Sequence, residues 1–268
     1  MTAQLVAAQA LDLWAYVAAV GGGALIGFLL ALFGGGGSVL ATPLLIYVVG
    51  VRDPHVAIGT AAAAVSLNAL AALHGQARAG QVKWPCALVF GAAGLAGSLT
   101  GAEIAKHVDG HRLLLWFALA MALVGGSMLL PKRSEGDPAV RLNRDLVIKL
   151  APVGLVTGLA AGFFGIGGGF LIVPGLMAAS GMTLAHAAAS SLVSVALFGA
   201  ATSASYAVSG LVDWPVFVAL VAGGVVGALL GGPAARAMAG HGASARRVFA
   251  LMVIAAAAYV GWRATHAI

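Results

Sequence analysis

The chain is a succession of long apolar segments separated by short polar connections. Most of these segments reach the roughly 20 residues that an α-helix needs to cross about 30 Å of hydrocarbon. Two of them are too short for a full crossing, because a helix rises only about 1.5 Å per residue. The pattern predicts an all-α, polytopic membrane protein in which the two short segments are broken or re-entrant helices. The predicted segments are residues 13–33, 38–50, 55–75, 84–104, 112–130, 147–164, 169–180, 185–208, 214–236 and 246–264.

The composition supports a membrane protein and excludes several functions. Only 8% of the residues are charged and 61% are hydrophobic, whereas a soluble domain carries about 25% charged residues. The net charge of +6 comes from Lys and Arg scattered over short loops, which indicates contact with the lipid bilayer and no nucleic-acid partner. The one cysteine, Cys86, excludes an intramolecular disulfide. No catalytic triad or metal-binding motif is present, so we expect no enzyme activity, no catalytic residue, no metal and no cofactor.

The N-terminal residues bear on localisation. Residues 1–12 contain no Lys or Arg, unlike the basic start of a cleaved signal peptide. We therefore expect the first apolar segment to remain as a membrane helix. A multi-pass protein of the bacterial inner (cell) membrane is predicted.

The second half of the chain repeats the order of motifs in the first half. Phe33, Pro43 and His55 fall on Phe164, Pro174 and His186 at one offset, which also matches Thr60 with Ser191; after a one-residue gap, Gly80–Pro85 falls on Gly210–Pro215. This predicts a first membrane repeat over 1–130, a linker over 131–146 and a second repeat over 147–268.

Loop charge indicates how the two repeats are related. The loop around Gln76–Lys83 carries two cations, whereas its counterpart Tyr206–Asp213 carries none. If each repeat makes an odd number of crossings, most Lys and Arg residues fall on one side together with the linker. The positive-inside rule then predicts two inverted repeats, each with about four to five apolar segments, and a cytoplasmic linker.

Clusters of glycine precede both short segments. Gly34–Gly37 and Gly165–Gly169 each follow a phenylalanine and come shortly before a proline. A glycine run weakens a helix, and broken helices in lipid are tolerated where the freed backbone lines a protein-enclosed cavity. Helices that begin there would aim unpaired N–H groups at the midplane and favour an anion. The alternative is that the glycines only allow close helix packing.

Polar residues within the apolar segments complete the predicted substrate site. Hydroxyl and amide groups suit the oxygens of a sulfonate or carboxylate, although Ser and Thr also bond to their own helices. Asn68 is costlier to bury and is the stronger candidate. The predicted substrate-binding residues are Gly34, Gly35, Gly36, Gly37, Ser38, Thr60, Asn68, Gly165, Gly167, Gly168, Gly169, Ser190 and Ser191.

The repeated Phe-Gly-rich elements Phe33–Ser38 and Phe164–Gly169, with the matched segments Ile58–Ala61 and Gly80–Pro85, resemble the sulfite exporter TauE/SafE family. The first copy departs from the second in having four consecutive glycines and Ser38. The resemblance implies transport of a small anion, such as sulfite, sulfoacetate or another sulfonate.

The expected function is a secondary membrane transporter, an exporter or a permease. One half would rock against the other, with a coupling ion such as a proton or sodium. The alternatives are a transporter of another small solute or of a cation, and a non-transporting membrane scaffold. The sequence leaves the exact substrate, the direction of transport and the oligomeric state open.

Overall fold

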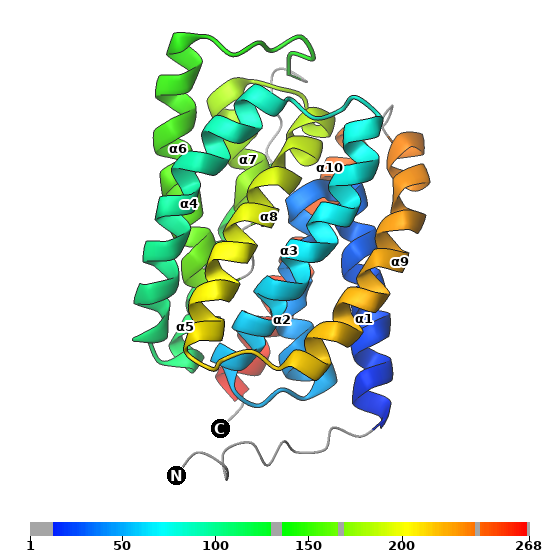
Figure 1. The fold of residues 1–268 in the computed structure, drawn as a ribbon, viewed down its shortest axis with the longest axis vertical. Coiled ribbons are helices and arrows are strands. Elements are labelled where there is room, and N and C mark those ends of the chain that lie inside the picture. Colours follow the sequence, from blue (N-terminus) through cyan, green and yellow to red (C-terminus); the bar gives the residue numbers. More distant parts are fainter. Residues whose placement is uncertain (1–12, 130–135, 166–168, 239–241, 267–268) are drawn as a thin grey trace.

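The computed structural model describes residues 13–129, 136–165, 169–238 and 242–266, which form a bundle of long helices (Figure 1). Seven segments within these ranges are long and apolar enough to cross a membrane, so the prediction of an all-α polytopic protein is confirmed. The helices are α1 (Leu13–Phe33), α2 (Ala41–Leu44), α3 (Pro54–Arg78), α4 (Trp84–Lys106), α5 (Gly110–Leu129), α6 (Arg144–Phe164), α7 (Gly169–Ser180), α8 (Leu184–Val208), α9 (Trp214–Met238) and α10 (Gly242–His266). A 3-10 helix (Gly34–Leu40) precedes α2 and a π-helical stretch (Leu45–Val49) follows it.

Several helices begin earlier than their apolar segments because polar residues cap them. Asp53 accepts a hydrogen bond from the backbone N–H of His55 at the start of α3. Asn143 accepts one from Leu146 at the start of α6, so this helix begins at Arg144 rather than at residue 147. Side-chain caps of this kind satisfy N–H groups that have no partner within the helix.

Helices of the two predicted repeats pack against one another. Helix α1 packs along α9, and its counterpart α6 packs along α4; α3 lies against α8, and α5 against α10. Helices α1 and α6 run in opposite directions, and the start of α6 lies at the opposite end of the bundle from the start of α1 and the end of α10 (Figure 1). The inversion of the two repeats stays a prediction.

Glycine allows the close contact between α1 and α9 and between α4 and α6. A Cβ atom on Gly27 would overlap the carbonyl of Gly224, and one on Gly158 would overlap that of Gly94. These glycines therefore permit close helix packing, as in other membrane helix pairs built on small residues.

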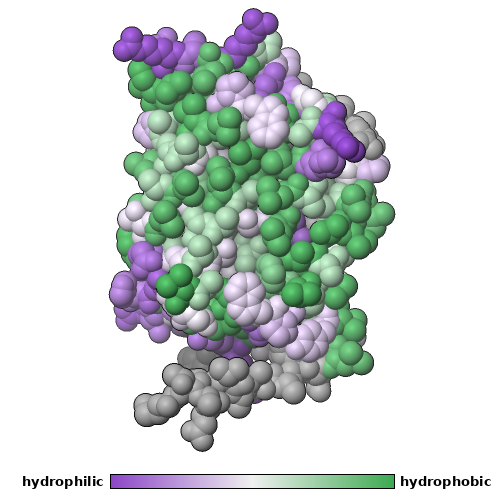
Figure 2. Space-filling model, in the orientation of Figure 1, coloured by the Kyte–Doolittle hydropathy of each residue, from purple (hydrophilic) through white to green (hydrophobic). Residues whose placement is uncertain are grey.

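The outer surface matches a bilayer. Figure 2 shows an apolar band around the middle of the bundle, with hydrophilic residues gathered towards its two ends. Trp84 and Trp214 begin α4 and α9 and are both exposed. Tryptophan at such positions is typical of the membrane interface.

Candidate functional site: the two glycine breaks

The chain reverses direction at Gly34. Helix α1 ends at Phe33, and Gly34 has a φ of +62°, in the left-handed region that glycine adopts without steric cost. A Cβ atom on Gly37 would overlap the backbone of Leu29 and Leu30, so the segment after Gly34 folds back along the last turns of α1. The predicted break is therefore present. It begins at Gly34, four residues before the predicted start at Ser38, and the short segment after it is a mixture of 3-10, α and π turns.

The second break has the same geometry at its start. Helix α6 ends at Phe164, and Gly165 is left-handed with a φ of +65°. The short helix α7 begins at Gly169, as predicted. Gly167 and Gly168 lie outside the described residues.

The two breaks touch one another through their backbones. A Cβ atom on Gly169 would overlap the carbonyl group of Gly35, and one on Gly35 would lie 2.6 Å from the Cα atom of Gly169. A Cβ atom on Gly34 would overlap the carbonyl of Ala188 in α8. Residues far apart in the sequence therefore meet where only glycine fits.

Hydrogen bonds join this contact to α8. The backbone N–H of Gly35 donates to Ser191 Oγ at 2.9 Å, and Ser191 Oγ donates to the carbonyl of Ala188 at 2.7 Å. Ser38 Oγ donates to the carbonyl of Gly35 at 2.7 Å. Ser38 and Ser191 are fully buried. The structure thus brings together five predicted site residues: Gly34, Gly35, Ser38, Gly169 and Ser191.

Thr60 and Ser190 lie in a different place and connect the two repeats. Thr60 Oγ1 accepts a hydrogen bond from the backbone N–H of Asp213 at 2.9 Å, just before α9. Ser190 Oγ accepts one from the N–H of Lys83 at 2.9 Å, just before α4. Each hydroxyl holds a loop of the other repeat.

These bonds correct the alignment of the repeats. Thr60 is the structural counterpart of Ser190, not of Ser191. Left-handed Gly50 and Gly181 keep the first offset, whereas α3 and α8 begin at Pro54 and Leu184, one residue closer. The gap therefore falls before these two helices, and Ala61 is the counterpart of Ser191.

Asn68 lies where α3 crosses α9. A Cβ atom on Gly224 would overlap its amide group, and Nδ2 donates to the carbonyl of Leu220 at 3.4 Å. Its Oδ1 atom is buried and accepts no hydrogen bond from the described residues. The counterpart of Asn68 is Phe198, which packs on Gly94 in the same way. The contacts of Asn68 are with α9, away from the two breaks.

Aromatic residues of α5 and α10 cover the breaks, and the sequence analysis missed them. Phe249 packs against Phe33 with ring centroids 5.3 Å apart, and a Cβ atom on Gly36 would overlap its ring. Phe117 packs against Phe164 at 5.8 Å. Only the matched positions of these phenylalanines in the two repeats could have marked them, since phenylalanine is an ordinary residue in a membrane helix.

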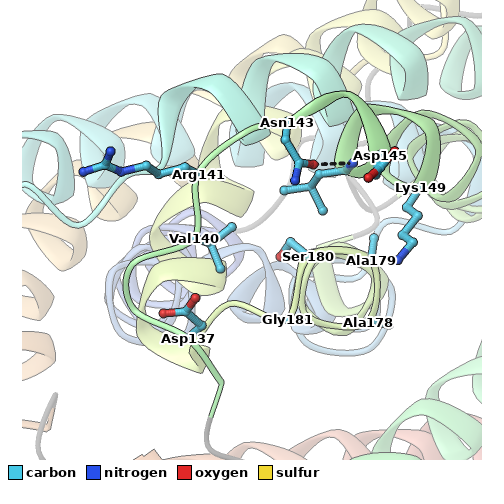
Figure 3. Close-up of a pocket in the computed structure, with 11 residues that line it drawn as sticks. Asp137, Val140, Arg141, Asn143, Asp145, Lys149, Ala178, Ala179, Ser180 and Gly181 are labelled. Carbon is cyan, nitrogen blue, oxygen red and sulfur yellow. Dashed lines mark hydrogen bonds between the residues drawn. The ribbon is translucent and has the colours of Figure 1, made fainter.

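A separate pocket of about 510 Å³ lies between the end of the linker, the start of α6 and the end of α7 (Figure 3). Asp137, Arg141, Asp145 and Lys149 line it with charges of both signs. The backbone N–H of Asp137 donates to the carbonyl of Gly181 at 2.8 Å, which attaches the linker to the loop after α7. The mixed charges favour no single class of ligand.

Ser191→Ala tests the hydrogen bonds at the breaks. The substitution leaves the buried N–H of Gly35 without its acceptor, which costs about 1–3 kcal/mol. We expect a lower melting temperature in detergent. Ser203→Ala is the control, because this exposed serine donates only to the carbonyl of Ala200 in its own helix. Equal melting temperatures for the two variants would show that the Gly35–Ser191 bond contributes nothing.

Comparison with known proteins gives the family. The sulfite exporter TauE/SafE family model matches residues 19–260. A "Probable membrane transporter protein" of Xylella fastidiosa (strain 9a5c) is 46% identical over 252 residues, which cover 92% of this chain and 95% of the relative. The "Probable membrane transporter protein YunE" of Bacillus subtilis (strain 168) is 28% identical over 239 residues, covering 81% and 87%. No solved structure matches the chain. The chain therefore belongs to the sulfite exporter TauE/SafE family and is a multi-pass bacterial membrane protein of a transporter family.

Proposed function

We propose that this protein is a secondary transporter of a small anion, sulfite or an organosulfonate such as sulfoacetate, which binds where the two glycine breaks meet. The observation that carries the proposal is the backbone contact between Gly35 and Gly169. Two helix breaks from opposite repeats, in contact within the membrane, are the usual setting of a transporter's binding site.

The chemistry of the site suits an anion. The described residues of the two breaks offer backbone N–H groups and the hydroxyls of Ser38 and Ser191, with no Lys or Arg among them. Gly36, Gly37, Gly165, Gly167 and Gly168 belong to the same proposed site. Donors without a formal charge can hold an anion and still release it, whereas a buried cation is costly in the bilayer. Binding would exchange the Gly35–Ser191 hydrogen bond for bonds to the ligand.

The orientation follows from the loop charges. At the end of the bundle formed by the last turns of α3 and α9 and the starts of α4, α6 and α10 lie Arg78, Lys83, Arg141, Arg144, Lys149, Arg236, Arg246 and Arg247. The opposite end carries Arg52, Lys106, Arg112 and Arg263. By the positive-inside rule, the linker end faces the cytoplasm and the repeats are inverted.

The helix pairing favours moving parts other than the two halves expected from the sequence. Since α1 packs on α9 and α6 on α4, the close helix pairs each combine both repeats. In alternating access, the moving units would therefore be groups of helices drawn from both repeats. The first half would not move as one unit against the second. The bonds from Lys83 and Asp213 to the opposite repeat also oppose separation of the halves.

A cation is the second candidate ligand, and Asn68 favours it at one place. The free atom of this buried side chain is an acceptor, Oδ1. An acceptor attracts a cation or a proton donor and repels an anion. Asn68 thus suits a coupling sodium ion or a proton donor better than the transported anion with which the sequence analysis grouped it.

Thermal stability of the detergent-purified protein tests the proposed function. Sulfite, sulfoacetate, taurine and carboxylates would be titrated singly, with sodium varied separately. A ligand that binds only the folded protein raises the melting temperature as its concentration exceeds its dissociation constant. We expect a sulfur oxyanion to give a shift that Ser191→Ala reduces. A shift with cations alone would contradict the anion proposal.

A further inference from the structure

We propose that the protein has a second anion-binding site, a cationic vestibule at the linker end that collects the anion before it reaches the glycine breaks. This inference rests on the proposed function and adds a capture site to it. The vestibule is a pocket of about 280 Å³ between α1, α3 and α9. Its polar lining residues are His74, Gln76 and Arg78, all from the last turns of α3.

The charge of the vestibule has one sign. His74 and Arg78 are exposed, and among the described residues neither has a hydrogen-bond or ion-pair partner. No Asp or Glu lines the pocket. A guanidinium with five donors and no carboxylate partner suits a sulfonate or sulfite oxygen.

A hydrogen bond joins helices α3 and α1 beside the vestibule. Gln76 Nε2 donates to the carbonyl of Ala31 at 2.9 Å, in the last turn of α1. This bond fixes the end of α3 against α1 and leaves one amide hydrogen of Gln76 for a ligand. Ala72 and Ala228 form the floor. The lining residue Ala31 lies about one helical turn before Gly34, where the first break begins.

At the opposite end of the bundle, the described residues at the equivalent positions of α8 carry no cation. At the equivalent positions in the second repeat, Ala204 replaces His74, Tyr206 replaces Gln76 and Val208 replaces Arg78. Glu103 stands at the position of Pro233, and its carboxylate pairs with Lys106 at 2.7 Å. The shared fold therefore does not require cations here. Their presence at one end gives the two faces of the protein different affinities for an anion.

Chemical labelling tests the vestibule without measuring transport. Ala71 lines the pocket, and Ala71→Cys in a Cys86→Ala background places one thiol there. Labelling rates would be compared for an anionic reagent, 2-sulfonatoethyl methanethiosulfonate, and a cationic one, 2-(trimethylammonio)ethyl methanethiosulfonate, each relative to a free thiol. Arg78 lies seven residues from Ala71 on α3, about 10 Å along the helix, and a cation at that distance in a water-like dielectric should favour the anionic reagent roughly fourfold. Methanesulfonate should slow the anionic labelling.

Charge removal decides between the vestibule and a general surface effect. Arg78→Gln with His74→Gln should bring the ratio of the two rates close to one and remove the protection by methanesulfonate. Arg144→Gln is the matched control, because it removes a cation from the same end but does not line the pocket, and the preference should persist. Leu229→Cys, also in the pocket lining and exposed, replaces Ala71→Cys if the latter fails to fold.

The outcomes separate this inference from the proposed function. A rate ratio near one, or a preference that survives loss of Arg78 and His74, would overturn the vestibule even if sulfite is transported. A preference that depends on Arg78, in a protein whose melting temperature and flux respond to no sulfur oxyanion, would support the vestibule and count against the proposed substrate class.

Discussion

Gly169→Val is expected to abolish transport while the protein still inserts into the membrane. The new side chain would occupy the space of the Gly35 carbonyl, and this backbone cannot turn aside as the end of a flexible side chain could, so the two segments would be forced apart. The breaks would separate, and the N–H and hydroxyl groups proposed to bind the anion would lose their relative positions. The measurement is sulfite flux into proteoliposomes, with the amount of inserted protein determined in the same preparation.

Substitutions at two further glycines, and alanine in place of valine, show how large an effect to expect. Gly36→Val should also abolish flux, but Gly36→Ala should be milder than Gly169→Ala, because its Cβ atom meets the outer edge of the Phe249 ring instead of backbone. Gly126→Val, in α5, has nothing within 4 Å of the added Cβ and should transport normally. Wild-type flux in Gly169→Val would place the site elsewhere.

Gly158→Val is expected to prevent accumulation of the folded protein. A Cβ atom here would overlap the carbonyl of Gly94 and lie 2.6 Å from its Cα atom, in the middle of the contact between α4 and α6. Forcing these helices apart exceeds the usual effect of a point mutation and should cost more than about 4 kcal/mol. The measurement is the yield of monodisperse protein after solubilisation and its melting temperature.

The matched control for this prediction is Gly21→Val in α1, another glycine within a membrane helix. Its added Cβ would have no neighbour within 4 Å, so near-normal yield is expected. Valine is β-branched, which lowers its helix propensity only slightly. A monodisperse Gly158→Val protein with wild-type melting behaviour would show that α4 and α6 can repack.

The positions of the helices could be predicted from the sequence, but their neighbours could not. Twenty apolar residues suffice to identify a span, because lipid demands little else. The same requirement makes membrane helices apolar on all sides, so no polar face shows which side of α1 meets α9. Gly27 and Gly224 mark that contact, but glycines also occur at Gly21 and Gly126, where a side chain would meet nothing.

The candidate site was predictable in part for a related reason. The glycine runs could be recognised as breaks because consecutive glycines weaken a helix, whereas close packing needs a small residue only about once per turn. Residue type alone could not show what each buried hydroxyl binds. Ser191 joins the breaks, whereas its neighbour Ser190 holds the loop before α4. The identity of a partner depends on tertiary packing, which one helix's sequence does not contain.

The pairing of α1 with α9 has a consequence for biosynthesis. Helix α1 ends at Phe33, whereas α9 begins only at Trp214, so α1 leaves the ribosome long before its main partner has been synthesised. Until then the glycine face of α1 must wait in lipid or against the insertion machinery. A nascent chain interrupted before α9 would therefore be a substrate for membrane quality control, and completion of the bundle would follow, rather than accompany, insertion of the individual helices.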